Sequence, residues 1–155
     1  MENLNKIASF TVNHDFIEVG IYISRVDDDI VTYDLRTRKP NSGDYMSNLT
    51  MHSLEHMFAT YIRNGSIAKS VIYFGPMGCQ TGFYLLVRNT PCQKVLDSVI
   101  ETLEKIVMHE GDIFGARREE CGNYQNLSVE AAKTEASRYL SALRKRVNDF
   151  RYNEG

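Results

Sequence analysis

Two histidines one helical turn apart are the residues of this 155-residue chain best placed to do metal chemistry. They lie in the segment His52-Ser53-Leu54-Glu55-His56. Residues four apart on a helix share a face, so both imidazole rings could reach one metal ion. Two nitrogens alone hold a metal poorly, and a third ligand is needed. The candidates are His14, His109, a carboxylate or a thiol.

The helix expected around these histidines has an apolar side and a polar side. Leu54 and Phe58 mark the apolar stripe, and at about 100° per residue His52 and His56 fall opposite to it. One interpretation is a solvated polar face that happens to hold two histidines. The other is a metal site covered by the sheet, a loop or a second subunit. Glu55 lies between the two sides and suits a general base, because a metal acidifies the group that the glutamate deprotonates.

The chain has three cysteines, and an odd number cannot all pair within one chain. The N-terminal segment has no basic patch followed by an apolar run, so we expect no secretory leader. Free thiols in a reducing cytoplasm are therefore expected. Such thiols serve as buried packing residues, metal ligands or nucleophiles.

The surroundings of the three cysteines differ. Cys79 lies in the glycine-rich segment 75–82, where glycines can let a ligand approach the backbone, so its thiol is a candidate acid/base or nucleophile. A buried structural cysteine is an equal alternative there. Cys121 follows two glutamates, which disfavour a bare thiolate but not one neutralised by a cation, so it fits the third ligand. Cys92 falls in a first helical turn and is interpreted as an incidental thiol.

The elements that must position these groups follow from periodicity. Alternating apolar residues predict strands at 19–26 and 30–35, joined by a turn at 27–29, and short apolar runs predict strands at 70–74 and 83–87. Helices are predicted at 49–64, from Thr90 to a stop at Gly111, and from Ser128 to Val147. Thr90 with Gln93 is expected to form a capping box, and Ser128 to cap the last helix. We expect an α+β fold, a largely antiparallel sheet packed by about three to four helices, as a single domain over residues 1–155.

Composition excludes several classes of protein. With 43% hydrophobic and 25% charged residues, the chain is not of the disordered type. Its formal net charge of −2, from 18 basic and 20 acidic residues, gives no field for a phosphate backbone, so no nucleic-acid partner is expected. No apolar run is long enough for a membrane span, so no membrane association is expected either.

Five ordered motifs resemble the S-ribosylhomocysteine lyase (LuxS) family. The five-residue histidine segment resembles the family's H-T-L-E-H, and 76–82 matches its catalytic-cysteine segment residue for residue. The other matching segments are Cys121-Gly122, Ser9-Phe10 with His14, and Asp34-Leu35-Arg36 with Pro40-Asn41. The chain departs from the family at Ser53, which replaces threonine, at Asn13, which replaces aspartate, and at Tyr73-Phe74-Gly75, which replaces D-I-S.

The resemblance implies metal-dependent cleavage of the thioether of S-ribosylhomocysteine to homocysteine and 4,5-dihydroxy-2,3-pentanedione, the autoinducer-2 precursor. The route is carbonyl migration followed by β-elimination. The implied metal ligands are His52, His56 and Cys121, holding one divalent metal per subunit, with Fe2+ expected and Zn2+ or Co2+ also compatible. Cys79 and Glu55 are the implied catalytic residues, both as proton carriers.

The resemblance also implies where the substrate binds. Ser9, His14 and Arg36 are the implied substrate-binding residues, in a cytoplasmic homodimer with active sites at the subunit interface. The roles implied in the cell are autoinducer synthesis for quorum sensing and homocysteine recycling in the methyl cycle.

Two alternatives carry different expectations. H-x-x-E-H is also the inverted zinc-protease signature, so a small metal-dependent hydrolase or peptidase is the first. In those proteases the third ligand is a downstream glutamate rather than a thiol. The second is a non-catalytic thiol or metal sensor using Cys79 and Cys121. An assay of thiol release from S-ribosylhomocysteine separates the lyase from both alternatives.

Overall fold

A computed structural model describes residues 4–153, except for the side chain of Ser9. Its four strands are β1 (Gly20–Asp27), β2 (Ile30–Arg36), β3 (Val71–Pro76) and β4 (Gly82–Arg88). Three long helices follow the sheet strands or lie between them: α2 (Asn48–Ile62), α3 (Cys92–Val107) and α4 (Val129–Arg144). The short α1 (Ala8–Thr11) and two 3-10 turns, His14–Phe16 and Ala68–Ser70, complete the elements.

The four strands form one antiparallel sheet in the order β1-β2-β4-β3. Strands β1 and β2 are a hairpin in which Asp27 pairs with Ile30, and Asp28 takes a positive φ of 55° in the turn. Aspartate tolerates this left-handed conformation better than most residues. The predicted strands and the turn at 27–29 are therefore confirmed, with ends that differ by one or two residues.

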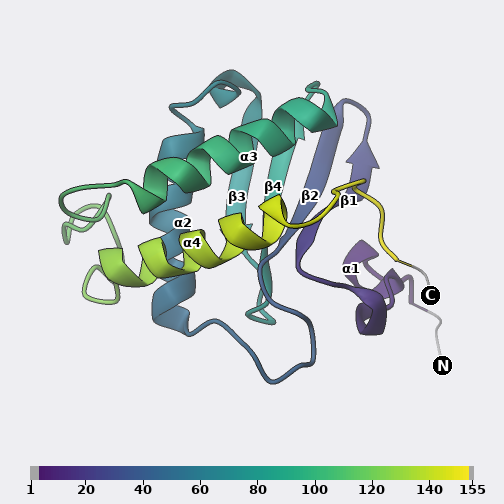
Figure 1. Ribbon diagram of the computed structural model, residues 1–155, viewed down its shortest axis with the longest axis horizontal. Coiled ribbons are helices and arrows are strands. Elements are labelled where there is room, and N and C mark those ends of the chain that lie inside the picture. The colour runs from purple at the N-terminus through teal and green to yellow at the C-terminus, as the bar shows by residue number, and fades with distance from the viewer. Residues whose placement is uncertain (1–3, 154–155) are drawn as a thin grey trace.

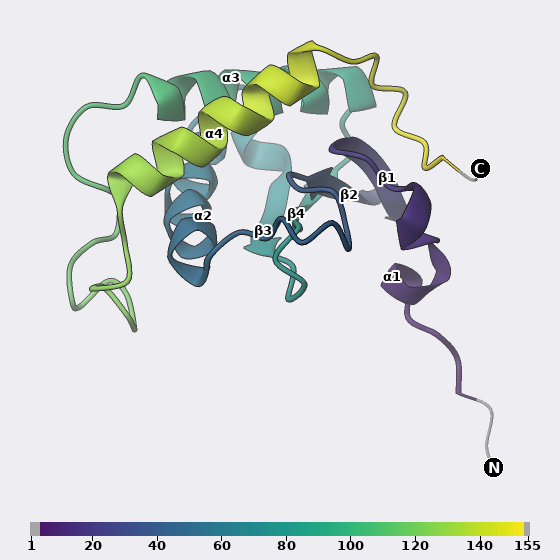
Figure 2. The ribbon, with the colours of Figure 1, turned by 60° about the horizontal axis from the view of Figure 1, so that its bottom comes forward.

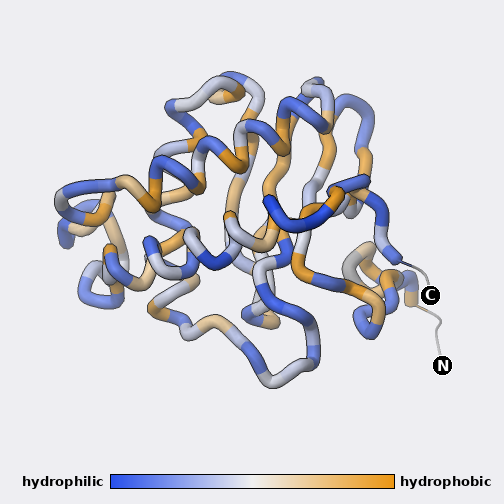
Figure 3. Tube along the Cα trace, in the orientation of Figure 1, coloured by the Kyte–Doolittle hydropathy of each residue, from blue (hydrophilic) through white to orange (hydrophobic). Residues whose placement is uncertain are grey.

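The long helices all cover the same face of the sheet. Figure 2 shows α2, α3 and α4 on one side of the strands, and each of the three packs against the other two. Hydrophobic residues recur along the strands and along the helices, while loops are mostly hydrophilic (Figure 3). The core between sheet and helices includes Tyr33, Leu35, Leu54, Met57, Phe58, Phe83, Leu85, Val99, Leu103, Ala136 and Tyr139. The predicted α+β class is confirmed.

The start of α3 differs from its predicted cap. Pro91, not Thr90, occupies the cap position, and no side chain caps this helix. The Thr90 hydroxyl instead donates to the Arg88 carbonyl at 2.9 Å, and the Gln93 amide donates to Asp97 at 2.9 Å. Strand β4 ends at Arg88 and Asn89 turns with φ of 42°, so Thr90 is still part of the turn. The predicted capping box is wrong.

The last helix begins as predicted and ends earlier. The Ser128 side chain accepts a hydrogen bond from the Ala131 amide at 3.2 Å, so its capping role is confirmed. The helix ends at Arg144, however, and Val147 is 88% exposed beyond it. The prediction that Val147 extends the buried stripe is wrong, because the chain leaves the helix before that turn.

After α4 the chain runs back along β1. The Ile23 amide donates to the Phe150 carbonyl at 2.9 Å, and Tyr22 and Phe150 form an isolated parallel bridge. The Tyr139 hydroxyl donates to the Gly20 carbonyl at 2.7 Å, which fixes α4 to the same strand. Figure 1 shows the segment that follows α4 passing beside β1.

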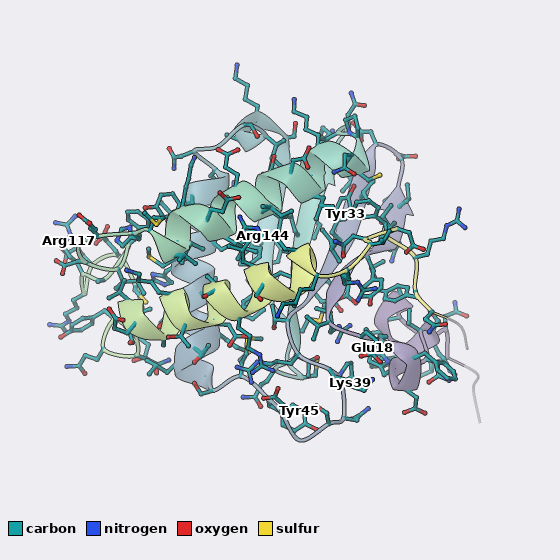
Figure 4. The ribbon with its side chains drawn as sticks, in the orientation of Figure 1. Glu18, Tyr33, Lys39, Tyr45, Arg117 and Arg144 are labelled. Carbon is teal, nitrogen blue, oxygen red and sulfur yellow. The ribbon has the colours of Figure 1, made fainter. Side chains whose placement is uncertain are left out.

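Ion pairs connect the loops to the elements. Lys39, after β2, pairs with Glu18, before β1, at 2.5 Å, and Arg144 of α4 pairs with Glu104 of α3 at 3.0 Å (Figure 4).

Within residues 4–153 no helix has the length and apolar character to cross a bilayer.

Candidate active site

Helix α2 and the loop that joins α3 to α4 bring three metal-ligating side chains together. His52 and His56 project from α2, and Cys121 comes from the loop, which folds beside that helix (Figures 1 and 2). One ligand atom from each of the three lies within 4.8 Å of the others. The loop of the same chain therefore supplies the cover that the histidine side of the helix requires.

Backbone carbonyls fix the orientation of both imidazole rings. His52 Nδ1 lies 2.8 Å from the Asn126 carbonyl oxygen, and His56 Nδ1 lies 2.8 Å from the Phe114 carbonyl oxygen. A carbonyl only accepts, so each Nδ1 carries the hydrogen and donates it. Each Nε2 is then the nitrogen with a free lone pair. This arrangement is common around ligating histidines, where the second ring nitrogen is hydrogen-bonded to set the tautomer.

The donor set fits a divalent metal. His52 Nε2 and Cys121 Sγ are 3.4 Å apart. Metal bonds of about 2.0 to 2.1 Å to nitrogen and 2.3 Å to sulfur sum to more than this distance, so one ion can bind both atoms. The Asn123 amide also donates to Cys121 Sγ at 3.4 Å, which holds the sulfur in place beside His52. Three protein ligands leave a further coordination position, as in catalytic sites.

Gly115 allows the loop to approach His56. Its φ is +67°, and a Cβ built on it would lie 2.9 Å from His56 Nδ1. A side chain at this position would therefore be strained by the backbone and would press on the ring. Glycine here serves the contact between Phe114 and His56.

Two further contacts hold the loop between α3 and α4. The buried His109 ring lies 2.7 Å from the Tyr61 hydroxyl and 2.9 Å from the Asp112 carbonyl oxygen. The buried Ser53 hydroxyl accepts from the Ser128 amide at 2.8 Å. His109 is thus not a third ligand but an anchor of the loop, and Ser53 ties the histidine helix to the start of α4.

Glu55 lies on α2 between the two histidines in sequence and is half-buried. It follows His52 by three positions and precedes His56 by one. Its carboxylate belongs to the helix that carries the ligands, as the sequence predicts for a general base. The predicted buried stripe of this helix is also present at Leu54, Met57 and Phe58.

Cys79 lies in the turn between β3 and β4 and lines two adjacent cavities. One, of about 280 Å³, is also lined by His14, Asn41, Tyr45 and Thr81, among others. The other, of about 440 Å³, has His14, Arg36, Tyr84, Phe10, Pro76, Met77 and Gly78 in its walls with Cys79. The Cys79 thiol is exposed, and its sulfur is 2.9 Å from Thr81 Oγ1. The alternative of a buried structural cysteine is wrong for Cys79.

Arg36 reaches the same thiol from β2. Its Nη1 lies 3.9 Å from Cys79 Sγ, and its Nε and Nη2 bind the Asp34 carboxylate at 3.0 and 2.6 Å. Burial opposes the charge on Arg36, but Asp34 outweighs burial and raises the pKa of Arg36 further. The guanidinium is therefore a permanent cation beside Cys79.

The C-terminal segment completes this ion pair. The Tyr152 hydroxyl donates to Asp34 Oδ2 at 2.8 Å, and its ring stacks on Tyr22 with centroids 4.9 Å apart. Burial first, and the Asp34 charge second, raise the pKa of Tyr152. The phenol is thus neutral and remains a donor to Asp34 at neutral pH.

The structure places two of the three predicted substrate-binding residues beside Cys79. His14 and Arg36 share a cavity with Cys79, although His14 comes from the N-terminal 3-10 turn. Ser9 lies in α1, and its side chain is outside the described part of the structure. The residues lining the two Cys79 cavities do not include His52, His56 or Cys121. The structure thus contains two clusters, one around the metal ligands and one around the thiol.

Cys92 and Tyr73 occupy other places. Cys92 is half-buried against the core and lines a larger cavity of about 900 Å³ under the C-terminal segment. Tyr73 is half-exposed, and a Cβ at position 75 would lie 2.0 Å from its hydroxyl oxygen. The tyrosine therefore fits over a glycine, so the departures at 73 and 75 depend on each other.

Sequence reasoning missed the residues that act through backbone atoms or through another side chain. Asn126 and Phe114 orient the histidines by their carbonyls, which any residue type provides, so the sequence carries no signal for them. Thr81 and Asp34 lie in two of the motifs that resemble the family but are given no role by the sequence, and Tyr152 lies in none of those motifs. Thr81 lies two residues after Cys79, and Asp34 two before Arg36, so proximity in the sequence was an available signal for these two.

Comparison with known proteins identifies the family of the chain. A family model described as S-Ribosylhomocysteinase (LuxS) matches residues 7–149. A protein named S-ribosylhomocysteine lyase from Finegoldia magna is 41% identical over 145 residues, which cover 90% of this chain and 92% of that protein. Proteins of the same name are 39% identical in Borreliella afzelii over 146 residues, covering 90% and 93%, and 36% identical in Clostridium acetobutylicum over 156 residues, covering 97% and 98%. Because these matches extend over nearly the whole chain, it belongs to the S-ribosylhomocysteinase (LuxS) family of carbon–sulfur lyases.

Proposed function

We propose that this protein cleaves the thioether of S-ribosylhomocysteine to homocysteine and 4,5-dihydroxy-2,3-pentanedione. The observation that carries the proposal is the convergence of His52, His56 and Cys121, with ligand atoms within 4.8 Å, in a chain of this family. Relatives that align with about nine-tenths of the chain bear the name of this activity. The two-histidine, one-thiolate set also disfavours the inverted zinc-protease alternative, whose third ligand is a glutamate.

The reaction requires several proton transfers before the carbon–sulfur bond can break. A thioether leaves easily only when it is β to a carbonyl, because a carbanion next to the carbonyl can then expel the thiolate. The sugar carbonyl starts at C1, so it must move to C2 and then to C3. Each move removes a proton from one carbon and returns a proton to its neighbour. The site therefore needs residues that accept and donate protons on the sugar.

A divalent metal held by His52, His56 and Cys121 supplies Lewis-acid polarisation of the sugar carbonyl. The protein's part is to keep each Nε2 aimed at the ion, through the carbonyls of Asn126 and Phe114. We expect Fe2+ in this site, and the same donor set is compatible with Zn2+ and Co2+.

Cys79 is the proposed carrier of protons in the two carbonyl migrations. Its exposed sulfur lies in a cavity and faces the permanent cation of Arg36 at 3.9 Å, which favours the thiolate form that can accept a proton. Glu55, on the ligand helix, is the proposed base for the later migration and the elimination. General acid–base groups of this kind contribute about 10²- to 10⁴-fold to a rate.

His14 and Arg36 are the proposed substrate contacts of the Cys79 cavity, together with Ser9. A cationic guanidinium and an imidazole suit the hydroxyls and the carboxylate of a small zwitterionic sugar thioether. The thiols at 79 and 121 must stay reduced to work, so the proposal assigns the reaction to the cytoplasm. Its products would serve autoinducer synthesis or homocysteine recycling.

We also propose a homodimer whose active sites lie at the subunit interface. The metal ligands belong to α2 and its covering loop, on the helix side of the sheet, whereas Arg36 and Tyr84 alternate with core residues and face the other side. That other face has an apolar hollow of about 320 Å³ lined by Tyr73, Tyr84 and Leu86. A second copy of the chain would cover this face.

The decisive experiment is release of homocysteine from S-ribosylhomocysteine, followed with a thiol reagent. Protein purified anaerobically and loaded with Fe2+ is expected to release one thiol per substrate. Protein stripped by a chelator should lose the activity and regain it on metal addition. Tight metal binding without thiol release would instead favour the sensor, and peptide hydrolysis without thiol release would favour the hydrolase.

A further inference from the structure

Thr81 lies between the Arg36 guanidinium and the Cys79 sulfur, and the reaction proposed above gives it no role. We propose that Thr81 is a positioning residue, whose hydroxyl donates a hydrogen bond to the Cys79 thiolate in a direction set by Arg36. The inference rests on the proposed function, in which Cys79 works as a thiolate.

The direction of the hydrogen bond follows from the donors available. Arg36 Nη1 is 2.8 Å from Thr81 Oγ1, and Thr81 Oγ1 is 2.9 Å from Cys79 Sγ. A guanidinium only donates, so the threonine oxygen must accept from Arg36. The single hydroxyl hydrogen then points away from Arg36 and is available to the sulfur. A thiolate has no hydrogen of its own, so in that form the sulfur can only accept.

Asp34 fixes the guanidinium in this direction. Its two carboxylate oxygens bind Arg36 Nε and Nη2, which leaves Nη1 to face Thr81 and Cys79. Tyr152 holds Asp34 from the C-terminal segment. Both members of the ion pair are nearly inaccessible to solvent, with side chains 4% and 1% exposed. Bidentate pairs of this kind have a defined geometry, so the guanidinium has little freedom to turn.

The backbone of Thr81 is held as firmly as its side chain. Its carbonyl accepts from the amides of Thr37 and Arg38, both at 3.0 Å, and from the Thr37 hydroxyl at 3.3 Å. Thr81 itself is 1% exposed, while Cys79 two residues earlier is exposed. A rigid donor thus meets a sulfur on the wall of the cavity, which is the arrangement expected for a group that holds a nucleophile or a proton carrier in place.

Other polar groups also face the sulfur. Arg36 of β2 is the nearby cation, His14 comes from the N-terminal 3-10 turn, and Tyr45 and Tyr84 line the cavities from the loop before α2 and from β4. The Arg36 nitrogen is 3.9 Å from the sulfur, whereas the Thr81 oxygen is 2.9 Å away. Removal of the Thr81 hydroxyl therefore takes away the closest of these contacts and leaves the cation.

The test measures the pH dependence of Cys79 alkylation in the metal-loaded protein. Iodoacetamide labels the thiolate, and peptide mass spectrometry reads Cys79 separately from Cys92 and Cys121. In Thr81→Val the midpoint of the pH profile is expected to rise by about one unit, a tenfold change in the thiol–thiolate equilibrium. Thr81→Ser keeps the hydroxyl and is expected to restore the midpoint to that of the unmodified protein.

Thr37→Val is the matched control. Thr37 is a buried threonine of the same network, 1% exposed. Its hydroxyl contacts the Thr81 carbonyl and the Met46 sulfur but not the Cys79 sulfur. Its loss should leave the alkylation midpoint unchanged. The proposal is overturned if Thr81→Val has the midpoint of the unmodified protein, or if Thr37→Val moves it equally. Should Thr81→Val fail to fold, Thr81→Ala makes the same prediction with a smaller side chain.

Alkylation requires no substrate, so the two proposals can fail separately. Absence of thiol release from the unmodified protein would remove the lyase function and leave the Thr81 measurement intact. If the unmodified protein releases thiol normally but the alkylation midpoint of Thr81→Val does not rise, the lyase function stands and the proposed role of Thr81 is wrong.

Discussion

At the scale of single residues, hydrogen bonds to the backbone decide which atoms can do chemistry. His52 and His56 both donate Nδ1–H to carbonyl oxygens at 2.8 Å, so each keeps Nε2 free to bind a metal. The Asp34 side chain binds Nε and Nη2 of Arg36, so Nη1 is left to contact Thr81 in the turn that holds Cys79. In the proposed reaction the chemistry is divided between metal ligands and proton carriers, and substitutions should separate the two.

Cys121→Ala is expected to lose the metal, and Cys79→Ala to keep it and lose turnover. The first removes a ligand from a set of three, while the second lies in a different cluster. Metal analysis should give close to one equivalent for Cys79→Ala, with thiol release lower by at least about 100-fold. A full equivalent of metal in Cys121→Ala would refute the ligand assignment.

Glu55→Gln is expected to bind metal normally but to stall before thiol release. The amide keeps the size of the side chain and cannot accept a proton, so homocysteine release should fall by about 10²- to 10⁴-fold. Metal content and thiol release measured on one preparation check both halves. Homocysteine production at the normal rate would remove Glu55 from its role as base.

At the scale of elements, loops placed by a few anchors complete the site. The loop between α3 and α4 brings Cys121 to α2, and it is held by His109, Ser53 and the carbonyls that face the histidines. The loop between β2 and α2 is held by ion pairs instead. Arg38 pairs with Glu135 of α4 and with Asp44, both at 2.5 Å, and Arg138 of α4 also pairs with Asp44.

Gly115→Ala should weaken metal binding by roughly 10- to 100-fold, because it displaces the loop that orients His56. Gly111→Ala is the matched control: Gly111 also has a positive φ, of 98°, but a Cβ there would meet nothing within 4 Å. Competition with a chelator measures the affinity of each variant. If both variants lose metal affinity equally, backbone strain alone, and not the contact with His56, is responsible for the loss.

Asp44→Asn should lower stability at neutral pH and not in acid. The hydrogen bond from Arg138, and the charges of Arg38 and Arg138, hold the pKa of Asp44 below its usual range. A lowered folded-state pKa adds stability above the unfolded value of about 3.9, and this stability is lost as pH falls through the folded-state pKa. Urea midpoints of the variant should therefore lie below those of the unmodified protein at pH 7 and approach them below about pH 4.

Asp28→Asn, in the exposed hairpin turn, controls for the loss of one negative charge. Its midpoint should stay close to that of the unmodified protein at both pH values. A gap for Asp44→Asn that persists unchanged at pH 3 would mean that packing, not charge, explains the effect.

At the scale of the whole molecule, the sheet has helices on one face and an apolar hollow on the other. The helix face holds the core and the proposed metal ligands, and the other face holds Tyr73, Tyr84 and Leu86 near the Cys79 cavities. A helix layer on only one face leaves the opposite face for another layer. In the proposed dimer that layer is the second subunit.

Leu86→Glu is expected to produce a monomer that binds metal but releases little thiol. A carboxylate on the proposed interface would have to be buried without a partner, at a cost of several kcal/mol. Sedimentation gives the mass, and metal analysis shows that the fold is intact. Val147→Glu, at an 88%-exposed site after α4, should leave both mass and activity unchanged. A monomeric, active unmodified protein would contradict the interface proposal.

The sequence by itself determined the local elements and the chemical inventory. Alternating residues, short apolar runs and helical periodicity predicted the four strands and the three long helices. They could do so because an element that buries one face repeats its apolar residues with the period of that element. Residue type and spacing also identified His52 and His56 as a pair and Cys121 as a fitting third ligand. Capping at Thr90 was predicted wrongly, since the turn after β4 extends further than the local pattern indicates.

Only the tertiary structure decided which distant groups meet. Cys121 is 69 residues from His52, and Tyr152 is 118 residues from Asp34, yet each pair is in contact. The carbonyls that orient the histidines belong to Phe114 and Asn126, whose side chains are irrelevant to that role. The side-chain contacts depend on how the segments after α3 and α4 fold back over α2 and β1. The carbonyl groups are the same in every residue, so no pattern in the sequence can mark the two that orient the histidines.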